Sequence, residues 1–305
     1  MAIYRLHAEF VAGSKGHSST AASAYRSGEK VRHEELVYRT KAKHQESMDK
    51  GEISTRFRKQ LADKGIELTG NARVEKLENR WEVVSGKQRF TVRQEMTGRN
   101  EDKPQLSIYS HRFHDYSRRK GVSHTEIMTP DDFPDWLKDR SELWNSHRAT
   151  EKRGDAQQAH EVQKALPREL SLEQNIGAVR GFVKEHFISQ GMIADISIHN
   201  DPENHNPHAH ILLTIRDFDG NGFGNVNREW NDGRDGMRKQ QLNHWRKEWS
   251  EHANRCLSDA GFSAKIDHRT LKAQGIDREP TVHMGKEATA MEKRGEETRR
   301  GLKTA

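Results

Sequence analysis

The chain has 305 residues, with 52 Lys and Arg against 46 Asp and Glu, and only 32% of its residues are hydrophobic. No segment approaches the run of about 20 apolar residues that a membrane helix needs, and the single cysteine excludes an internal disulfide and a cysteine-rich zinc site. We therefore expect a soluble, cytoplasmic protein with a thin core. Its net charge of +6 favours a polyanionic partner.

The N-terminal segment predicts a strand followed by a short helix. Residues 3–11 alternate in polarity, which is the period of a half-buried strand. After a Gly- and Ser-rich turn, Ser18–Thr20 offer N-caps for an Ala-rich helix that ends near Gly28. Tyr25 lies on this helix, directly after the first strand.

Residues from about 35 to 112 differ from the rest of the chain in composition and hydrophobic pattern. A charged stretch up to Gly65 predicts a helix, and three short runs rich in Val and aromatic residues predict a small sheet at 80–84, 89–93 and 105–109. We interpret this region as an inserted α+β subdomain.

Further elements alternate along the remaining chain. The patterns predict strands at 123–128, 161–166, 192–199 and 208–214, and helices at 134–150, from the capping-box pair Ser171 and Gln174 onward, and at 237–260. The tail from Gly285 is charged and lacks an apolar face. This pattern predicts a frayed helix or disorder.

Histidines gather at the ends of two consecutive predicted strands. His199 closes one strand, while His208 and His210 share a face of the next because strand side chains at i and i+2 point the same way. If the strands are antiparallel neighbours, three neutral imidazoles converge and leave positions open for substrate and water, as a catalytic metal site requires. The alternative is a polar, exposed strand face. We expect His205 in the loop to face solvent, and the pattern leaves His7 as either a neighbour of the cluster or a surface residue.

Tyr25 is the candidate nucleophile. Arg26 adjoins it, Lys15 and Lys30 are near in sequence, and cationic neighbours together with a divalent ion favour a phenolate. From position alone, a tyrosine that packs its helix onto the sheet is the simpler interpretation.

Several blocks of sequence together resemble the MobA/MobL family of plasmid conjugative relaxases. These blocks are AIYRL at 2–6, AASAYRSGEK at 21–30, ALPREL at 165–170, NPHAH at 206–210, IDHRTL with QGI at 266–276, and PTVHMG at 280–285. They occur in the order typical of the family and cover residues 1–34 and about 113–290.

The resemblance implies an α+β fold of the histidine-hydrophobe-histidine (HUH) endonuclease type, with a central antiparallel sheet flanked by helices. Residues 1–34 and 113–285 would form the relaxase domain, with a charged tail at 286–305. In the family pattern, a block like HDYSRRKGV at 114–122 follows the tyrosine block after few residues, whereas some eighty residues intervene here. The segment 35–112 is therefore an insertion of unknown role.

The resemblance also implies a reaction. Tyr25 matches a tyrosine that attacks the scissile phosphodiester at the nick site of a transfer origin, giving a 5′-phosphotyrosine link and a free 3′-hydroxyl that can later be rejoined. His199, His208 and His210 match the ligands of a divalent metal, Mn²⁺ or Mg²⁺, and imidazole ligands favour a softer ion than Mg²⁺. Glu161 lies on a predicted strand, on the same face as Gln163 and Ala165, and could lie near the metal. The pattern leaves three roles open for it: an acid/base group, a partner for a ligand histidine, or a surface glutamate.

DNA contacts are predicted from basic and aromatic residues near these blocks. Trp230 is a candidate platform for base stacking, while Trp245 and Trp249 at helical spacing predict core positions. The candidate DNA-binding residues are Lys15, Arg26, Arg216, Arg228, Trp230 and Arg269.

The expected partners are single-stranded or locally melted origin-of-transfer DNA, accessory proteins of the relaxosome and a conjugative coupling protein, without membrane insertion. Two alternatives stay open. One is a rolling-circle replication initiator with the same chemistry, and the other is a non-catalytic, origin-binding accessory protein.

Overall fold

The computed structural model of the chain describes residues 6–12, 18–96, 104–151, 153–201, 204–220, 222–231, 237–277 and 285–299. Lys15 and most of the block at 280–285 lie outside these residues. Among the described residues, no helix is long and apolar enough to cross a membrane.

The main sheet of the fold is a five-stranded antiparallel sheet. Its order is β1 (Leu6–Ala12), β8 (Gln157–Ala165), β10 (His208–Leu213), β9 (Ala194–His199) and β7 (Val122–Met128). The first strand of the chain therefore pairs with β8 across more than a hundred residues of sequence. The predicted strands at 123–128, 161–166, 192–199 and 208–214 all lie in this sheet.

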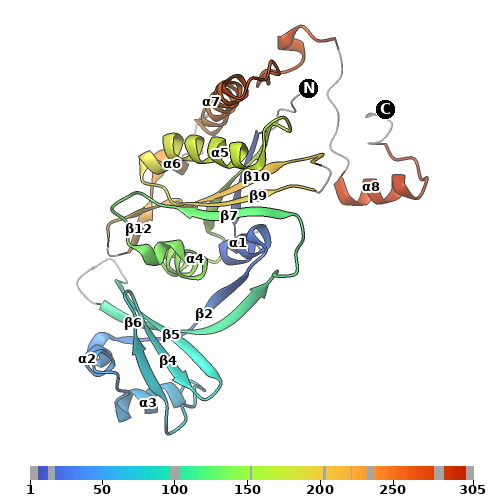
Figure 1. Ribbon diagram of the computed structural model, residues 1–305. Helices are drawn as coiled ribbons and strands as arrows, with labels where there is room; N and C mark the ends of the chain where they lie inside the picture. The colour runs from blue at the N-terminus through green and yellow to red at the C-terminus, as the bar shows by residue number, and fades with distance from the viewer. Residues whose placement is uncertain are drawn as a thin grey trace.

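Helices cover both faces of this sheet (Figure 1). One face packs against α5 (Leu172–His186) and α7 (Met237–Asp259), and the other packs against α4 (Arg140–Ala149) and lies beside α1 (Ser19–Ser27). On β10, Ala209 and Ile211 enter the core under α5 and α7. The strand period thus directs His208 and His210 to the face that carries α1.

The helix ends follow from local chemistry. The Ser18 side chain accepts a hydrogen bond from the Ala21 amide at the start of α1, and Gly28 ends α1 in the left-handed region at φ 66°. A Cβ at Gly28 would lie 3.1 Å from Val122, so the close approach of β7 also requires glycine. The predicted capping box of Ser171 and Gln174 is confirmed at the start of α5.

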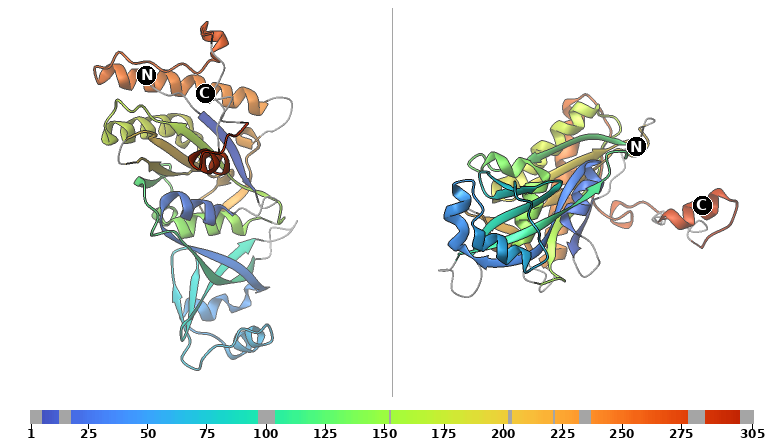
Figure 2. Two further views of the ribbon diagram at one scale, coloured as in Figure 1. Left: turned by 90° about the vertical axis from the view of Figure 1, so that its right-hand side faces the viewer. Right: turned by 90° about the horizontal axis from the view of Figure 1, so that it is seen from below.

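A second antiparallel sheet lies beyond α1 and α4 (Figures 1 and 2). Its order is β2 (Lys30–Lys41), β6 (Pro104–Asp115), β5 (Gln88–Met96), β4 (Trp81–Ser85) and β3 (Arg73–Lys76). Together with α2 (Gln45–Asp49) and α3 (Thr55–Ala62) it encloses its own apolar core, which includes Phe57 and Val92. The remaining elements are η2 (Ala42–His44), η3 (Asp135–Lys138), η4 (Ile188–Gln190), β11 (Arg216–Phe218), β12 (Phe223–Val226), α6 (Arg228–Asn231), η5 (Lys272–Gln274) and α8 (Gly285–Lys293).

Two predicted helices differ from the structure. The charged stretch from residue 35 to Gly65 is a strand through Lys41, because β2 pairs with β6 over its whole length and this distant partner overrides the local pattern. The predicted helix 134–150 is divided, since Asp139 caps α4 and only a 3₁₀ turn precedes it.

Buried charges join the second sheet to α4. Arg93 on β5 lies 3.1 Å from carboxylate oxygens of both Glu34 on β2 and Glu142 on α4. Burial alone would raise the pKa of Glu34, but Arg93 and Arg32 outweigh burial and lower it to about 2. Paired, hydrogen-bonded groups of this kind tolerate burial, whereas removing one partner leaves a buried charge uncompensated.

Lys164 on β8 is the exception to this pairing. Its side chain is fully buried under α5 and α7, with Nζ 3.6 Å from the ring centroid of Phe182 and 4.0 Å from that of Trp249. Nζ has no hydrogen-bond partner among the described residues. Burial lowers the pKa of Lys164 well below its usual value. A cation–π contact is worth about 2 kcal/mol, less than the several kcal/mol that burying an ion costs, so the amine is neutral in the folded protein.

We predict that Lys164→Met raises the free energy of unfolding by about 1–3 kcal/mol above a pH of about 10.4, where the amine is neutral in both states, and by more at neutral pH, because it replaces an unsatisfied buried amine with an apolar side chain of similar length. The unfolded parent binds one more proton than the folded parent between the lowered pKa and about 10.4, so parental stability rises with pH in this window. The advantage of the variant should therefore shrink by about 1.4 kcal/mol per pH unit there. Urea titrations at several pH values measure it.

Lys184→Met on the exposed side of α5 is the matched control and should change stability by less than about 0.5 kcal/mol. A Lys164→Met variant that is no more stable than the parent, or whose advantage does not depend on pH, would contradict the neutral buried amine.

Candidate active site

Three histidines converge at one end of the main sheet. His208 on β10 pairs directly with His199 on β9, and His210 follows on the same face. Ring centroids lie 4.8 Å apart for His199 and His210, 5.1 Å for His208 and His210, and 5.3 Å for His199 and His208. One ligand nitrogen of each ring lies within 4.8 Å of the others. The cluster predicted from the strand pattern could therefore hold a metal ion.

Each imidazole is oriented by an acceptor outside the cluster. His199 Nε2 lies 2.6 Å from the backbone oxygen of Arg26, His208 Nδ1 lies 2.7 Å from that of Asn206, and His210 Nδ1 lies 2.7 Å from Glu161 Oε1. Carbonyl and carboxylate oxygens only accept, so the ring nitrogens must donate in these bonds. The lone pairs then reside on Nδ1 of His199 and on Nε2 of His208 and His210. Ligand histidines in metal sites are held in this way, so the donor set fits a divalent ion.

Burial lowers the pKa of two of the three cluster histidines. It lowers the pKa of His199 to about 4, although the hydrogen bond to Arg26 opposes the shift. Burial also lowers the pKa of His210, and it outweighs the raising effect of Glu161. Both rings are therefore neutral at pH 7, as metal ligation requires.

Glu161 on β8 connects the cluster to α1. Its Oε1 accepts hydrogen bonds from His210 and from Arg26 Nε at 2.8 Å, and its Oε2 accepts one from Arg26 Nη2 at 3.0 Å. Burial would raise the pKa of Glu161, but the hydrogen bonds from His210 and Arg26 prevail and lower it to about 2. Glu161 is thus a carboxylate at neutral pH. Of the roles that the sequence left open, this geometry favours a partner for a ligand histidine over an acid/base group or a surface residue.

Cations surround the ring of Tyr25. The Arg119 guanidinium carbon lies 3.8 Å from the ring centroid and that of Arg26 lies 5.1 Å from it. Arg119 also donates a hydrogen bond to the backbone oxygen of Tyr25, and the ring of Tyr116 meets that of Tyr25 edge-on at 5.4 Å. Lys30 lies elsewhere, over Phe113.

Asp195 anchors α1 and α4 to the sheet beneath them. Its buried carboxylate accepts hydrogen bonds from Ser23 on α1 at 2.5 Å, from Trp144 Nε1 at 2.9 Å and from Arg140 Nε at 3.0 Å. Arg140 also pairs with Glu29, just after α1. These contacts, with those of Arg26, position the helix that carries Tyr25.

The predicted DNA-binding residues are scattered. Arg216 is buried, and its guanidinium donates hydrogen bonds to the Glu151 carboxylate and to the Gly224 carbonyl oxygen. Arg228 is exposed at the start of α6, and Arg269 is exposed and paired with Asp267.

Trp230 requires a correction. Its indole is only 6% exposed and belongs to the core under α5 and α7, so it cannot offer a face for base stacking. Trp245 and Trp249 lie in the same core, as their helical spacing predicts. His205 and His7 are at least half exposed.

Sequence reasoning did not single out Arg119, Tyr116 and Asp195. Arg119 and Tyr116 lie in the block at 114–122, which resembles a family block that follows the tyrosine, and that proximity was the available signal. Asp195 alternates opposite the apolar face of its strand, but no sequence pattern names Ser23 or Trp144 as its partners.

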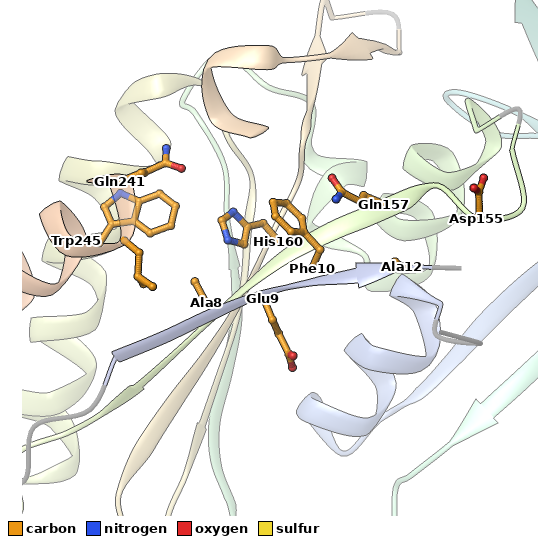
Figure 3. A pocket seen from close by; sticks show the side chains of 10 residues that line it. Ala8, Glu9, Phe10, Ala12, Asp155, Gln157, His160, Gln241 and Trp245 are labelled. Atoms are coloured by element: carbon orange, nitrogen blue, oxygen red, sulfur yellow. The ribbon is translucent and has the colours of Figure 1, made fainter. Parts of the chain in front are cut away.

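A cavity of about 450 Å³ lies on the other face of the sheet, between β1, β8 and α7. Figure 3 shows the rings of Phe10, His160 and Trp245 gathered there, with Glu9 pointing away from them. Because the histidine cluster faces α1, this cavity is separate from the candidate site.

Comparisons with known proteins show the family of the chain. The model of the MobA/MobL family matches residues 107–294. The chain belongs to the MobA/MobL family. Conjugal transfer protein TraA of Agrobacterium fabrum is 37% identical over 209 residues, which cover 60% of this chain and 19% of TraA. Mobilization protein MobL of Acidithiobacillus ferridurans is 34% identical over 215 residues, which cover 61% of this chain and 56% of MobL.

This MobA/MobL chain thus spans about a fifth of the length of TraA. A solved structure described as "Molecular Basis of Vancomycin Resistance Transfer in Staphylococcus aureus" aligns with a TM-score of 0.56 and 24% identity, covering 88% of this chain and all of that one. The predicted α+β fold, with a central antiparallel sheet flanked by helices, is confirmed, and the sheet predicted at 80–109 is part of a second sheet of five strands.

We predict that Glu161→Gln weakens Mn²⁺ binding by about 10–100-fold, because the amide no longer provides the negative charge that orients and polarises His210. Isothermal titration calorimetry with MnCl₂ on the folded protein measures it. Glu151→Gln is the matched control: this carboxylate is also largely buried and paired with an arginine, but it contacts no cluster histidine. Equal Mn²⁺ affinity for Glu161→Gln and the parent would show that Glu161 does not support the cluster.

Proposed function

We propose that this chain is a DNA relaxase that nicks one strand at a plasmid origin of transfer and rejoins it afterwards. The observation that carries the proposal is the double contact of Arg26, the residue after Tyr25. Its backbone oxygen accepts a hydrogen bond from His199, and its side chain pairs with Glu161, which holds His210. A candidate nucleophile and a candidate metal site are therefore tied together. The relationship to conjugal transfer and mobilization proteins supports the same function.

In the proposed reaction, the Tyr25 oxygen attacks the scissile phosphorus and the bond from phosphorus to the 3′-oxygen breaks. The phenol loses its proton, the released 3′-oxygen gains one, and the DNA 5′-end stays attached to the tyrosine as a phosphodiester. Rejoining is the reverse attack by a 3′-hydroxyl. Arg119, against the ring of Tyr25, supplies positive charge where the phenolate and the attacked phosphate gather negative charge.

His199, His208 and His210 would hold the divalent ion, which when bound supplies Lewis-acid stabilisation of the phosphate oxygens. Mn²⁺ suits three imidazoles better than Mg²⁺ does. Glu161 keeps His210 in one tautomer, and Arg26 both neutralises Glu161 and fixes the end of α1. Each of these contacts is made before substrate arrives, which is the condition for preorganised catalysis.

We further propose that residues 1–34 and 113–285 form the relaxase unit and that 35–112 are inserted into it, with 286–305 as a tail. The substrate would be single-stranded or locally melted DNA, and relaxosome accessory proteins and a coupling protein would be partners. Arg228 and Arg269 are exposed and could reach phosphates.

We predict that Tyr25→Phe abolishes the covalent protein–DNA adduct, because the phenyl ring has no oxygen to attack phosphorus, while DNA binding is retained. Labelled single-stranded oligonucleotides that tile the cognate transfer region, incubated with Mn²⁺ and resolved on a denaturing gel, measure adduct formation. Fluorescence anisotropy measures binding.

Tyr38→Phe, in the second sheet, is the control and should leave the adduct intact. A Tyr25→Phe protein that forms adduct as well as the parent, or an adduct that mass spectrometry maps to Tyr116, would show that Tyr25 is not the nucleophile. Binding without any adduct in the parent would instead indicate a non-catalytic accessory protein.

A further inference from the structure

The orientation of the Tyr25 side chain depends on a few neighbouring groups. Tyr25 lies in the last turn of α1 and is only half-buried. A tyrosine in a helix has two accessible χ1 orientations, and the groups packed against its ring decide which one is populated. Three side chains lie near this ring: the guanidinium groups of Arg26 and Arg119, and the ring of Tyr116. Of these three, Tyr116 has no part in the reaction proposed above.

The Tyr116 ring meets the Tyr25 ring edge-on. Their centroids lie 5.4 Å apart, and the two ring planes are inclined at 85°. This arrangement is favourable because the positive edge of one ring faces the negative face of the other. The Arg119 guanidinium carbon lies 3.8 Å from the same Tyr25 centroid. A perpendicular ring and a close guanidinium together favour one orientation of the Tyr25 side chain over the other.

Backbone hydrogen bonds hold Tyr116 in place. Its amide donates to the Glu29 carbonyl at 3.2 Å, just after α1, and its carbonyl accepts from the Arg119 amide at 2.8 Å. The second of these bonds closes a turn from Tyr116 to Arg119. Both groups that pack on the Tyr25 ring from this side therefore belong to one turn, and that turn is bonded to the end of the helix that carries Tyr25.

The loop that continues from this turn is attached to the histidine cluster. The Gly121 carbonyl accepts a hydrogen bond at 2.9 Å from the amide of Asn200, the residue after His199. Gly121 has φ 85°, and a Cβ there would lie 3.4 Å from the Asn200 backbone oxygen, so this approach requires glycine. The loop 116–121 thus joins the end of α1 to the strand end at His199, and main-chain bonds fix the position of Tyr116 relative to both.

We propose that Tyr116 is a positioning residue for Tyr25: its ring holds the Tyr25 side chain in the orientation in which the phenol oxygen reaches the scissile phosphorus. The proposal rests on the proposed relaxase function, which makes Tyr25 the nucleophile. Tyr116 acts by packing its ring and takes no part in making or breaking bonds. Displacing a reacting group by about 1 Å can slow a reaction about a hundredfold, so the orientation of the nucleophile matters for the rate.

The kinetic test uses the full-length protein in excess over a labelled oligonucleotide of the cognate transfer region that forms an adduct with the parent. We expect Tyr116→Leu to lower the single-turnover rate of adduct formation in Mn²⁺ by about 3–10-fold, the contribution of one aromatic pair. Its affinity for the same oligonucleotide in EDTA, read by fluorescence anisotropy, should be unchanged. Tyr116→Phe keeps the ring and should restore the parental rate. Tyr116 is 38% exposed, which favours folding of both variants.

Phe113→Leu is the matched control for loss of an exposed ring. Phe113 lies on β6, three residues before Tyr116, and its ring lies against Lys30. The variant should form adduct at the parental rate.

A spectroscopic test reports the contact without DNA or metal. In protein labelled with 3-fluorotyrosine, the ¹⁹F signal of Tyr25 should shift in Tyr116→Leu, because the field of the neighbouring ring is lost, and should keep its parental position in Tyr116→Phe. The Tyr38 signal should not move in either variant, whereas a general loss of structure would move it as well.

The proposal is overturned if Tyr116→Leu forms adduct at the parental rate, or if it weakens DNA binding while the rate at saturating protein is unchanged. It is also overturned if Tyr116→Phe loses as much rate as Tyr116→Leu, because the hydroxyl rather than the ring would then be required. These outcomes leave the relaxase function intact, since the parent still forms the adduct. A parent that forms no adduct with any oligonucleotide would instead refute the relaxase function, and the role of Tyr116 with it.

Discussion

A single buried carboxylate, Glu161, connects the two halves of the candidate site. It lies on β8 and accepts from His210 on one side and from Arg26 on the other. Burying an unpaired carboxylate here would cost several kcal/mol. The hydrogen bonds from His210 and Arg26 offset this cost and lower the pKa of Glu161 to about 2. Because β8 lies between β1 and β10 in the sheet, the carboxylate sits where the N-terminal and central segments of the chain meet. The link from α1 to His210 depends on that position, whereas His199 contacts the backbone of Arg26 directly.

The rest of the main fold holds the same face in place. Apolar residues of β9 and β10 enter the core under α5 and α7, and the strand period turns His199, His208 and His210 toward α1. Asp195, on the same face of β9, ties α1 and α4 to the sheet, and buried arginine–glutamate pairs tie α4 to the second sheet. The second sheet is thus fixed against α4 by charge pairs.

Local patterns predicted much of this architecture, and their failures have physical causes. Strand alternation and the i, i+2 rule were sufficient to place the three histidines together, and capping chemistry located α1 and α5. The pattern failed where a distant partner decides the outcome. The local pattern of residues 35–41 predicts a helix, but these residues pair with β6. Trp230 is a residue type suited to base stacking, but α6 packs its indole into the core. The contacts of Glu161, Arg119 and Asp195 join segments far apart in sequence, so periodicity could suggest a face but not a partner.

The central claim is that Tyr25 and the histidine cluster form one site, and paramagnetic broadening by Mn²⁺ tests it most directly. The protein would be labelled with 3-fluorotyrosine, its five tyrosine signals assigned through Tyr→Phe variants, and ¹⁹F spectra recorded during titration with Mn²⁺. The account predicts that the Tyr25 signal broadens first and most, followed by Tyr116, while Tyr38 in the second sheet changes least, and that Glu161→Gln requires more Mn²⁺ for the same effect. A Tyr25 signal that stays sharp while Mn²⁺ binds would contradict the account.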